Sequence, residues 1–319
     1  MRRLLYISLS CLALLFVVLF VWAVFINKPV QASPVSPLPN FLSLSENNQV
    51  KLLDFWQPII EAISGEDETI AFSAESILIF DLTTNKTLYE KNTKEKLAMA
   101  SLTKIMTAIV ALENKKPDDR YVVRAEYLVG ENTMGLEKGE VLSLEELLYG
   151  LILHSGNDAA ETLAGSFPGG KSAFVVAMNN KAKALGAEQT VFSNPSGLQG
   201  DGSQLSTAYD LLVITRYALE AFPLFRKVSE TYEYTIPQTT THKEYVLTNE
   251  TNLLSSYPGV KGVKTGYTPE AGLCLVTYLD HKGHKLIGIL LNSENRRQEM
   301  KDLLDLSLTS LGIKPPEHE

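Results

Sequence analysis

Ser101 and Lys104 are the first residues of the chain whose types and spacing could do chemistry. They form the chain's single S-x-x-K pattern and open an apolar segment with helical periodicity. A separation of three residues places a hydroxyl and an amine on one face of a helix, where the amine can take the hydroxyl proton. The start of a helix also directs backbone N–H groups toward a developing oxyanion. The alternative is a helix cap followed by a solvated lysine.

Ser155 and Asn157 form a second candidate motif, between two apolar segments. A hydroxyl and an amide at such a break can relay a proton and hold a substrate amide. The spacing itself has little specificity, because Ser45 and Asn47 match it too. The alternative is a turn between two helices that serine or asparagine caps.

Lys264, Thr265 and Gly266 form a third motif, within a strand candidate at residues 262–268. Alternation along the strand predicts Lys264 and Gly266 on one side. The lysine would then offer a cation to a substrate carboxylate, and the glycine would let the substrate backbone approach. The alternative is an exposed lysine on an ordinary strand.

The elements that must position these motifs follow from hydrophobic periodicity. Helical spacing of apolar residues occurs in segments 97–112, 143–164, 171–185, 207–221 and 295–311. Strand candidates occur before and after the helical middle, at residues 76–80, 87–89, 262–266, 273–279 and 285–291. We therefore predict an α+β domain whose antiparallel sheet is formed from both ends of the domain and is flanked by helices.

The segment Leu4 to Ile26 has no charged residue and follows Arg2 and Arg3. Its length matches a helix that crosses a hydrocarbon core about 30 Å thick. The arginines should stay in the cytoplasm, which exports the rest of the chain. The alternative is a signal peptide cleaved near Ala32. Both interpretations place the three motifs outside the cytoplasm.

Charge and composition limit the kinds of ligand and partner that the protein is expected to bind. The formal net charge of -8 and the pI of about 5.3 lack the basic character that nucleic-acid binding requires. The five histidines show no H-E-x-x-H pattern, so we predict no metal site and no cofactor. Cys11 and Cys274 should lie on opposite sides of a proline-rich spacer and should not pair.

The order of the three motifs is typical of serine penicillin-recognising enzymes. The surrounding residues closely resemble the low-molecular-mass penicillin-binding proteins of the serine D-alanyl-D-alanine carboxypeptidase family, peptidase family S11. The matching segments are residues 98–107, 147–160, 194–198 and 257–268. The resemblance runs from about Ser76 to about Leu311 and implies the fold of β-lactamases and transpeptidases, with a helical subdomain. One departure is Gln204, where many members of the family carry histidine.

The resemblance also implies a role for each motif residue. Ser101 matches the acylated nucleophile, Lys104 its general base and Ser155 the proton relay. The positions that match substrate binding are Asn157, Lys264, Thr265, Gly266 and Tyr267. The backbone N–H groups of Ser101 and Tyr267 match the oxyanion hole.

The implied reaction removes the terminal D-alanine from peptidoglycan stem pentapeptides that end in D-Ala-D-Ala, with β-lactams as covalent inhibitors. The implied location is the bacterial cell membrane, reached through the amino-terminal segment, with the catalytic domain outside the cytoplasm. The alternatives are a β-lactamase of the same fold and a non-catalytic homologue that binds cell wall.

The domain organisation follows from these interpretations. Residues 1–27 are the expected anchor or signal segment, and residues 28–68 the spacer, rich in proline and serine, with a short amphipathic helix. Residues 69–313 are the expected catalytic domain, and residues 314–319 a tail.

Overall fold

The computed structural model describes residues 71–198, 204–251 and 253–318. Across these ranges, no helix combines the length and the apolar character that membrane crossing requires. The expected anchor at residues 4–26 and the expected amphipathic helix before Gly65 lie outside the described residues. The domain boundaries therefore stay predictions.

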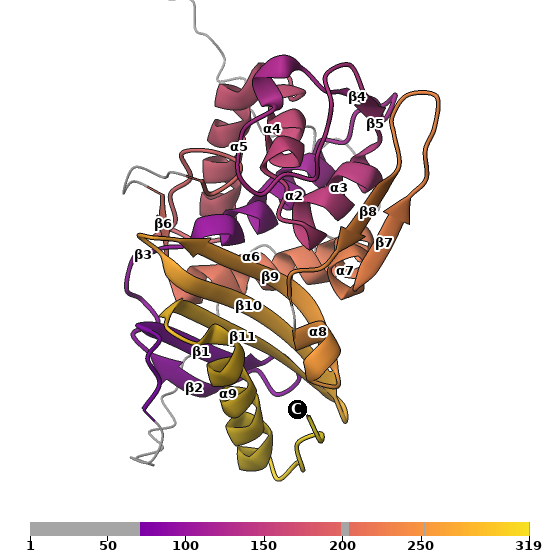
Figure 1. Ribbon diagram of the computed structural model, residues 1–319. Coiled ribbons are helices and arrows are strands. Elements are labelled where there is room, and N and C mark those ends of the chain that lie inside the picture. The colour runs from indigo at the N-terminus through magenta and orange to yellow at the C-terminus, as the bar shows by residue number, and fades with distance from the viewer. Residues whose placement is uncertain (1–70, 199–203, 252, 319) are drawn as a thin grey trace, which may run out of the picture. The chain divides into compact units, whose positions relative to one another are not determined.

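An antiparallel sheet of five strands is the centre of the fold. Its strands, in spatial order, are β2 (Lys86–Lys91), β1 (Ser76–Asp81), β11 (His284–Ser293), β10 (Gly272–His281) and β9 (Val260–Thr268). β1 pairs with β11, so Figure 1 shows an early strand in indigo beside a late strand in yellow. The prediction of a sheet completed by both ends of the domain is confirmed.

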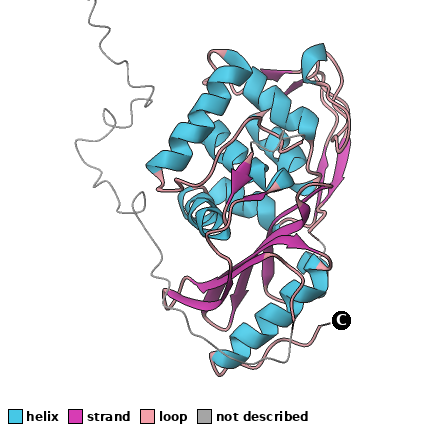
Figure 2. Ribbon diagram, turned by 90° about the vertical axis from the view of Figure 1, so that its left-hand side faces the viewer, coloured by secondary structure: helices cyan, strands magenta, loops and turns pink. Residues whose placement is uncertain are grey.

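The two faces of the sheet bury different sets of side chains, because successive residues of a strand point to opposite sides. On β1, Leu78 and Phe80 belong to the larger core with the helices, whereas Ile77 and Ile79 pack in a second core with α9 (Arg296–Ser310). Figures 1 and 2 show α9 on the face of the sheet opposite the main group of helices. Both faces are therefore covered, and the helical side is the one that carries the motifs.

The helical part lies between β2 and β9 in sequence. Its longer helices are α2 (Lys104–Glu113), α3 (Leu144–Leu153), α4 (Asn157–Gly165), α5 (Gly170–Ala184), α6 (Ala208–Ala221) and α7 (Pro223–Glu230). The start of α3 has a local cause, a capping box in which Ser143 and Glu146 exchange side-chain and backbone hydrogen bonds. Similarly, the Thr207 side chain accepts from Asp210 N at the start of α6. The predicted α+β class, with a helical subdomain, is confirmed.

The first predicted helix begins later than its apolar pattern suggests. Leu97–Ala98 form strand β3, which pairs with β6 (Leu205–Ser206), and Ala100–Thr103 form the 3₁₀ turn η2 before α2. Ala100 has a φ of +46°, which no continuous α-helix can include. The pairing of β3 with a distant segment overrides the local helical periodicity.

Several short elements were not predicted. They are β4 (Tyr121–Val122), η3 (Ala125–Tyr127), β5 (Val141–Leu142), β7 (Glu233–Ile236), β8 (Tyr245–Thr248) and α8 (Leu253–Ser256), together with α7. The hairpin of β7 and β8 reaches over α3, where Tyr234 stacks on Tyr149 with ring centroids 3.6 Å apart. Such short strands are stabilised by tertiary contacts, which periodicity does not reveal.

Candidate active site

The three motifs converge where η2, the break between α3 and α4, and β9 meet. Ser101 lies in η2 and Lys104 is the first residue of α2. Ser155 and Asn157 lie at the break and at the first position of α4. Lys264 lies within β9 and acts electrostatically on Lys104. The predicted pairing of hydroxyl and amine on one face is confirmed by a Lys104 Nζ to Ser101 Oγ distance of 2.9 Å.

The Lys104 amine is held by three acceptors from three parts of the chain. Besides Ser101 Oγ, its Nζ lies 2.7 Å from Asn157 Oδ1 and 2.6 Å from the Ser196 carbonyl oxygen. An ammonium has three donors, so a charged lysine would use all of them here. A neutral amine has two donors and one lone pair. With both donors on the two carbonyl-type oxygens, the lone pair points at the Ser101 hydroxyl.

Burial favours the neutral form of the Lys104 amine. The Lys104 side chain is fully buried, and this desolvation lowers its pKa well below the ordinary lysine value. The positive charge of Lys264 lowers the pKa further, whereas Glu250, Asp158 and Glu161 oppose the shift. The solvated lysine considered from the sequence is therefore wrong for Lys104.

Lys264 is also buried, with only 1% of its surface exposed. Burial, together with the Arg296 charge, lowers the pKa of Lys264 to about 8, and Glu250 opposes the shift. At neutral pH this lysine is still mostly a cation, and its Nζ donates to the Thr265 carbonyl at 3.1 Å. An exposed strand lysine, the alternative considered from the sequence, is wrong.

Gly266 lets β9 lie directly against the turn that carries Ser101. A Cβ at position 266 would lie 3.1 Å from the Ala100 Cβ and 3.1 Å from the Ser101 nitrogen, tighter than ordinary van der Waals contact. The neighbouring Tyr267 is 61% exposed and pairs in register with Leu273 of β10. The strand and the turn therefore bring Tyr267 and Ser101 to the same edge of the sheet.

Ser155 adopts a strained backbone conformation beside Asn157. Its φ is +55°, in the left-handed region that few non-glycine residues occupy. Its hydroxyl is buried and has no hydrogen-bond partner among the residues that the structure describes. A buried hydroxyl without a partner is costly, and a strained residue of this kind is often part of a functional site.

Asn157 is held by a loop that the sequence analysis did not single out. Its Nδ2 donates to the Glu131 carbonyl at 2.9 Å, and its backbone N–H donates to the Asn132 carbonyl at 2.7 Å. The next residue, Asp158, is buried and its carboxylate accepts backbone N–H bonds from the same loop. The three donors are Met134, Gly135 and Leu136, at 2.9–3.0 Å. Asp158 therefore fixes the loop that orients Asn157.

Arg296 is a second residue that the sequence analysis missed. It opens α9, and its Nη1 donates to the Gly266 carbonyl at 2.6 Å and to the Cys274 carbonyl at 3.3 Å. These bonds join β9 and β10 beside the Lys264 motif. No periodic pattern links an arginine at a helix start to strands more than twenty residues earlier, so the sequence held no signal for it.

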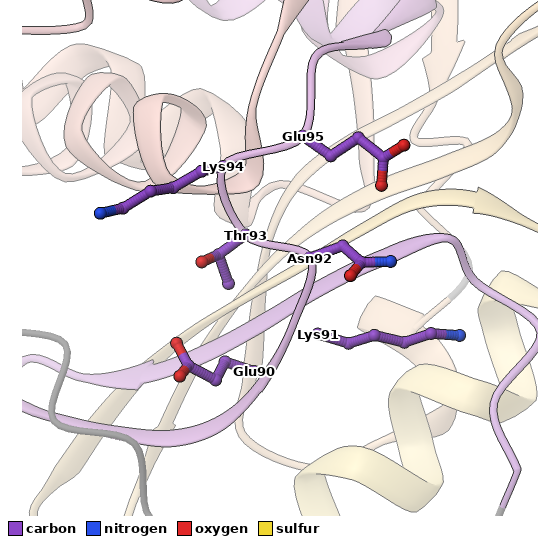
Figure 3. Close-up of a pocket in the computed structure, with 6 residues that line it drawn as sticks. All are labelled: Glu90, Lys91, Asn92, Thr93, Lys94 and Glu95. Atoms are coloured by element: carbon purple, nitrogen blue, oxygen red, sulfur yellow. The ribbon is translucent and has the colours of Figure 1, made fainter.

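A surface hollow lies elsewhere, around the end of β2. It is lined by Glu90, Lys91, Asn92, Thr93, Lys94 and Glu95, as Figure 3 shows. The hollow is open and contains no motif residue, and its Lys91 Nζ already donates to the Phe72 and Ala74 carbonyls. We therefore place the candidate site at the motif cluster and not at this hollow.

Metal-ligating side chains do not cluster within the part of the chain that the structure describes. No group of three or more His, Cys, Asp or Glu residues there is arranged to hold a metal ion. Cys274 is a buried free cysteine whose thiol pKa burial raises to about 11, so it is a core residue and not a thiolate. The absence of a metal from the whole protein stays a prediction.

An antiparallel sheet flanked by helices, with a half-buried serine beside a buried lysine against its edge strand, defines the class of serine penicillin-recognising enzymes. Residues 63–295 match the model of the D-alanyl-D-alanine carboxypeptidase family, and the chain belongs to that family. It is 34% identical over 255 residues to the D-alanyl-D-alanine carboxypeptidase DacF of Bacillus subtilis, covering 77% of this chain. It is 36% identical over 216 residues to DacB2 of Mycobacterium tuberculosis, covering 67% of this chain and 73% of that protein.

Solved structures agree with this classification. The DD-transpeptidase of Streptomyces K15 superposes with a TM-score of 0.71 at 32% identity, over 75% of this chain and 98% of that one. Penicillin-binding protein D2 of Listeria monocytogenes, solved with cefotaxime bound, gives a TM-score of 0.66 at 28% identity, over 75% of this chain and 98% of that one. The match with DacF spans only 65% of the length of that relative. The family and the fold are thus established, and the activity of this chain is inferred below.

Proposed function

We propose that this protein is a serine-type D-alanyl-D-alanine carboxypeptidase, which removes the terminal D-alanine from peptidoglycan stem pentapeptides. The observation that carries the proposal is the Lys104 amine, which is buried, has a lowered pKa and lies 2.9 Å from Ser101 Oγ. This arrangement is that of a nucleophile beside its own general base. The family names of the relatives point to the same reaction.

The proposed reaction has two steps. Ser101 Oγ attacks the carbonyl carbon of the penultimate D-alanine, while Lys104 takes the hydroxyl proton and then returns it toward the leaving amine, with Ser155 as relay. The C–N bond breaks, terminal D-alanine leaves, and an ester to Ser101 remains. Water, activated by the same base, then hydrolyses the ester. The backbone N–H groups of Ser101 and Tyr267 would stabilise the oxyanion in both steps.

The remaining motif residues would bind the substrate. Lys264 and Thr265 would hold its terminal carboxylate, since a buried cation forms a strong charge-assisted hydrogen bond with that group. The Asn157 side chain, fixed by the loop at 131–136, would contact the substrate amide. Gly266 would keep this binding strand close against the turn that carries Ser101, so that the bound substrate lies beside the nucleophile. β-Lactams, which mimic the substrate, would acylate the same serine and leave a long-lived adduct.

Incubation of the purified chain with a peptide ending in D-Ala-D-Ala, and separately with penicillin, tests the proposal. We expect release of free D-alanine and a long-lived mass increase of one penicillin per protein. Rapid penicillin turnover without peptide cleavage would identify a β-lactamase instead. Neither product nor adduct from a folded protein would identify a non-catalytic homologue.

We further propose that residues 4–26 anchor the protein in the bacterial cell membrane, with the catalytic domain outside the cytoplasm. The support is the uncharged length of this segment and the preceding Arg2 and Arg3. Amino-terminal sequencing of the protein extracted from its native membrane tests this. A mature chain that begins at Ser33 would instead identify a cleaved signal peptide.

A further inference from the structure

Gln204 is a buried amide whose two ends bind different parts of the site. The side chain is only 4% exposed. Its Oε1 accepts from the backbone N–H groups of Ser193 and Asn194 at 2.9 and 3.0 Å. Its Nε2 donates to Thr103 Oγ1 at 2.8 Å. Gln204 thus joins the loop at residues 193–198, here called the carbonyl loop, to the turn that carries Ser101.

The carbonyl loop supplies one of the two oxygens that orient the Lys104 amine. The Ser196 carbonyl accepts from Lys104 Nζ at 2.6 Å. Asn194 fixes the curvature of the loop, because its Oδ1 accepts from the N–H groups of Ser196 and Gly197 at 3.1 and 2.7 Å. The position of the Ser196 carbonyl therefore depends on where residues 193 and 194 are held.

Two other contacts tie the carbonyl loop to the nucleophile segment, and neither replaces Gln204. Thr107 Oγ1 donates to the Pro195 carbonyl at 2.6 Å. Gly197, at a φ of +83°, lies so close to η2 that a Cβ there would be 2.0 Å from the Ala100 carbonyl oxygen. These contacts hold the far part of the loop, whereas Gln204 holds its start. Thr103, the partner of Gln204, lies between Ser101 and Lys104 and donates to the Ala100 carbonyl at 2.8 Å.

We propose that Gln204 is a positioning residue of the acylation step, which fixes the Ser196 carbonyl so that the Lys104 lone pair points at the Ser101 hydroxyl. The inference rests on the proposed function, in which Lys104 is the general base. Gln204 itself acts through the carbonyl loop and through Thr103. An amide suits this role because it accepts at one end and donates at the other.

Gln204→Met tests the proposal, since methionine keeps the approximate shape and removes both hydrogen-bonding ends. We expect acylation by a chromogenic penicillin to slow by about 10- to 100-fold, because displacement of a catalytic group by about 1 Å can reduce the rate by that much. KM for the D-Ala-D-Ala peptide should change little, because Lys264 and Asn157 remain. The Ser196 carbonyl stabilises the charged form of Lys104, so its displacement in the variant should lower the Lys104 pKa. The acid limb of the acylation pH profile should therefore move to lower pH.

Two further variants separate positioning from a purely structural role. Gln204→His should recover most of the rate, because neutral imidazole offers one acceptor and one donor. The matched control is Gln238→Met, at an exposed site in the hairpin of β7 and β8, and it should acylate at the native rate. If Gln204→Met does not fold, Thr103→Val carries the test, because it removes the acceptor of Gln204 Nε2 with little change in volume.

The outcomes are distinguishable from failure of the proposed function. A wild-type protein that neither binds penicillin covalently nor cleaves the peptide refutes the proposed function itself. A wild-type protein that acylates, with a folded Gln204→Met that acylates equally fast and has an unmoved acid limb, refutes the positioning role. The positioning role is likewise refuted if Thr103→Val, as the substitute variant, leaves the acylation rate and its pH profile unchanged.

Discussion

Asp158→Asn should weaken both the stability of the domain and the acylation step. The Asp158 carboxylate accepts from the N–H groups of Met134, Gly135 and Leu136, the last two through one oxygen, Oδ2. Asparagine keeps one oxygen and replaces the other with an NH₂ group that cannot accept. With Oδ1 retained, the Gly135 and Leu136 donors lose their acceptor and face another donor.

The size of the effect follows from those two bonds. Hydrogen bonds to a charged acceptor contribute about 1.5–3 kcal/mol each, so the free energy of unfolding should fall by about 3–6 kcal/mol. A domain of this size loses about 2–4 °C of Tm per kcal/mol, so Tm should fall by about 6–24 °C. The loop also supplies the Glu131 and Asn132 carbonyls that hold Asn157, so acylation should slow on the order of tenfold.

Denaturant unfolding and penicillin acylation, measured on the same preparation, check this prediction. Asp118→Asn is the matched control, because Asp118 is exposed and its ion pair with Lys116 has a long N–O distance of 3.8 Å. A surface pair of this kind contributes about 0–1 kcal/mol. Asp158→Asn with the stability and acylation rate of Asp118→Asn would refute the assignment of Asp158 as the residue that fixes the loop.

Three further predictions concern Lys104 and Lys264. Lys264→Ala should impair cleavage of peptides with a free terminal carboxylate, by about 1.5–3 kcal/mol in kcat/KM, much more than cleavage of amidated ones; equal losses on both would remove its role. Lys104→Ala should slow acylation about 10²- to 10⁴-fold, and Lys104→Arg should rescue little because arginine stays protonated; a native rate in either variant contradicts the base assignment. The pH profile of kcat/KM should rise as Lys104 loses its proton and fall above about pH 8 as Lys264 loses its charge. The Lys264→Arg variant stays charged, so an alkaline limb that does not move in this variant would show that another group titrates there.

The sequence predicted most of the secondary structure, because its long elements carry strong periodicity. α5, α6 and α9 lie within a few residues of the expected segments, as do the five strands of the central sheet. The misplaced start of α2 and the missed hairpin of β7 and β8 share one cause. Both depend on contacts with distant segments, the pairing of β3 with β6 and the packing of the hairpin on α3, which local pattern does not encode.

The candidate site was predictable to the level of its motifs and no further. Ser101, Lys104 and Asn157 meet as their spacing and order suggested. The Ser196 carbonyl and the residues that place it were not predictable as ligands, because a backbone oxygen has no sequence signature. Gln204 stood out only as a departure from the family pattern, and its bonds to Thr103 and the carbonyl loop required the fold.

Intact-mass analysis of the Ser101→Ala protein with penicillin tests the central claim most directly, since the mechanism assigns the acyl bond to this hydroxyl. Wild-type protein should gain one penicillin mass, which peptide mapping should locate at Ser101, and should release D-alanine from the peptide. Ser101→Ala, shown folded by circular dichroism, should gain no mass and release no D-alanine. A Ser101→Ala protein that still carries one penicillin, or still releases D-alanine at the native rate, would contradict the account.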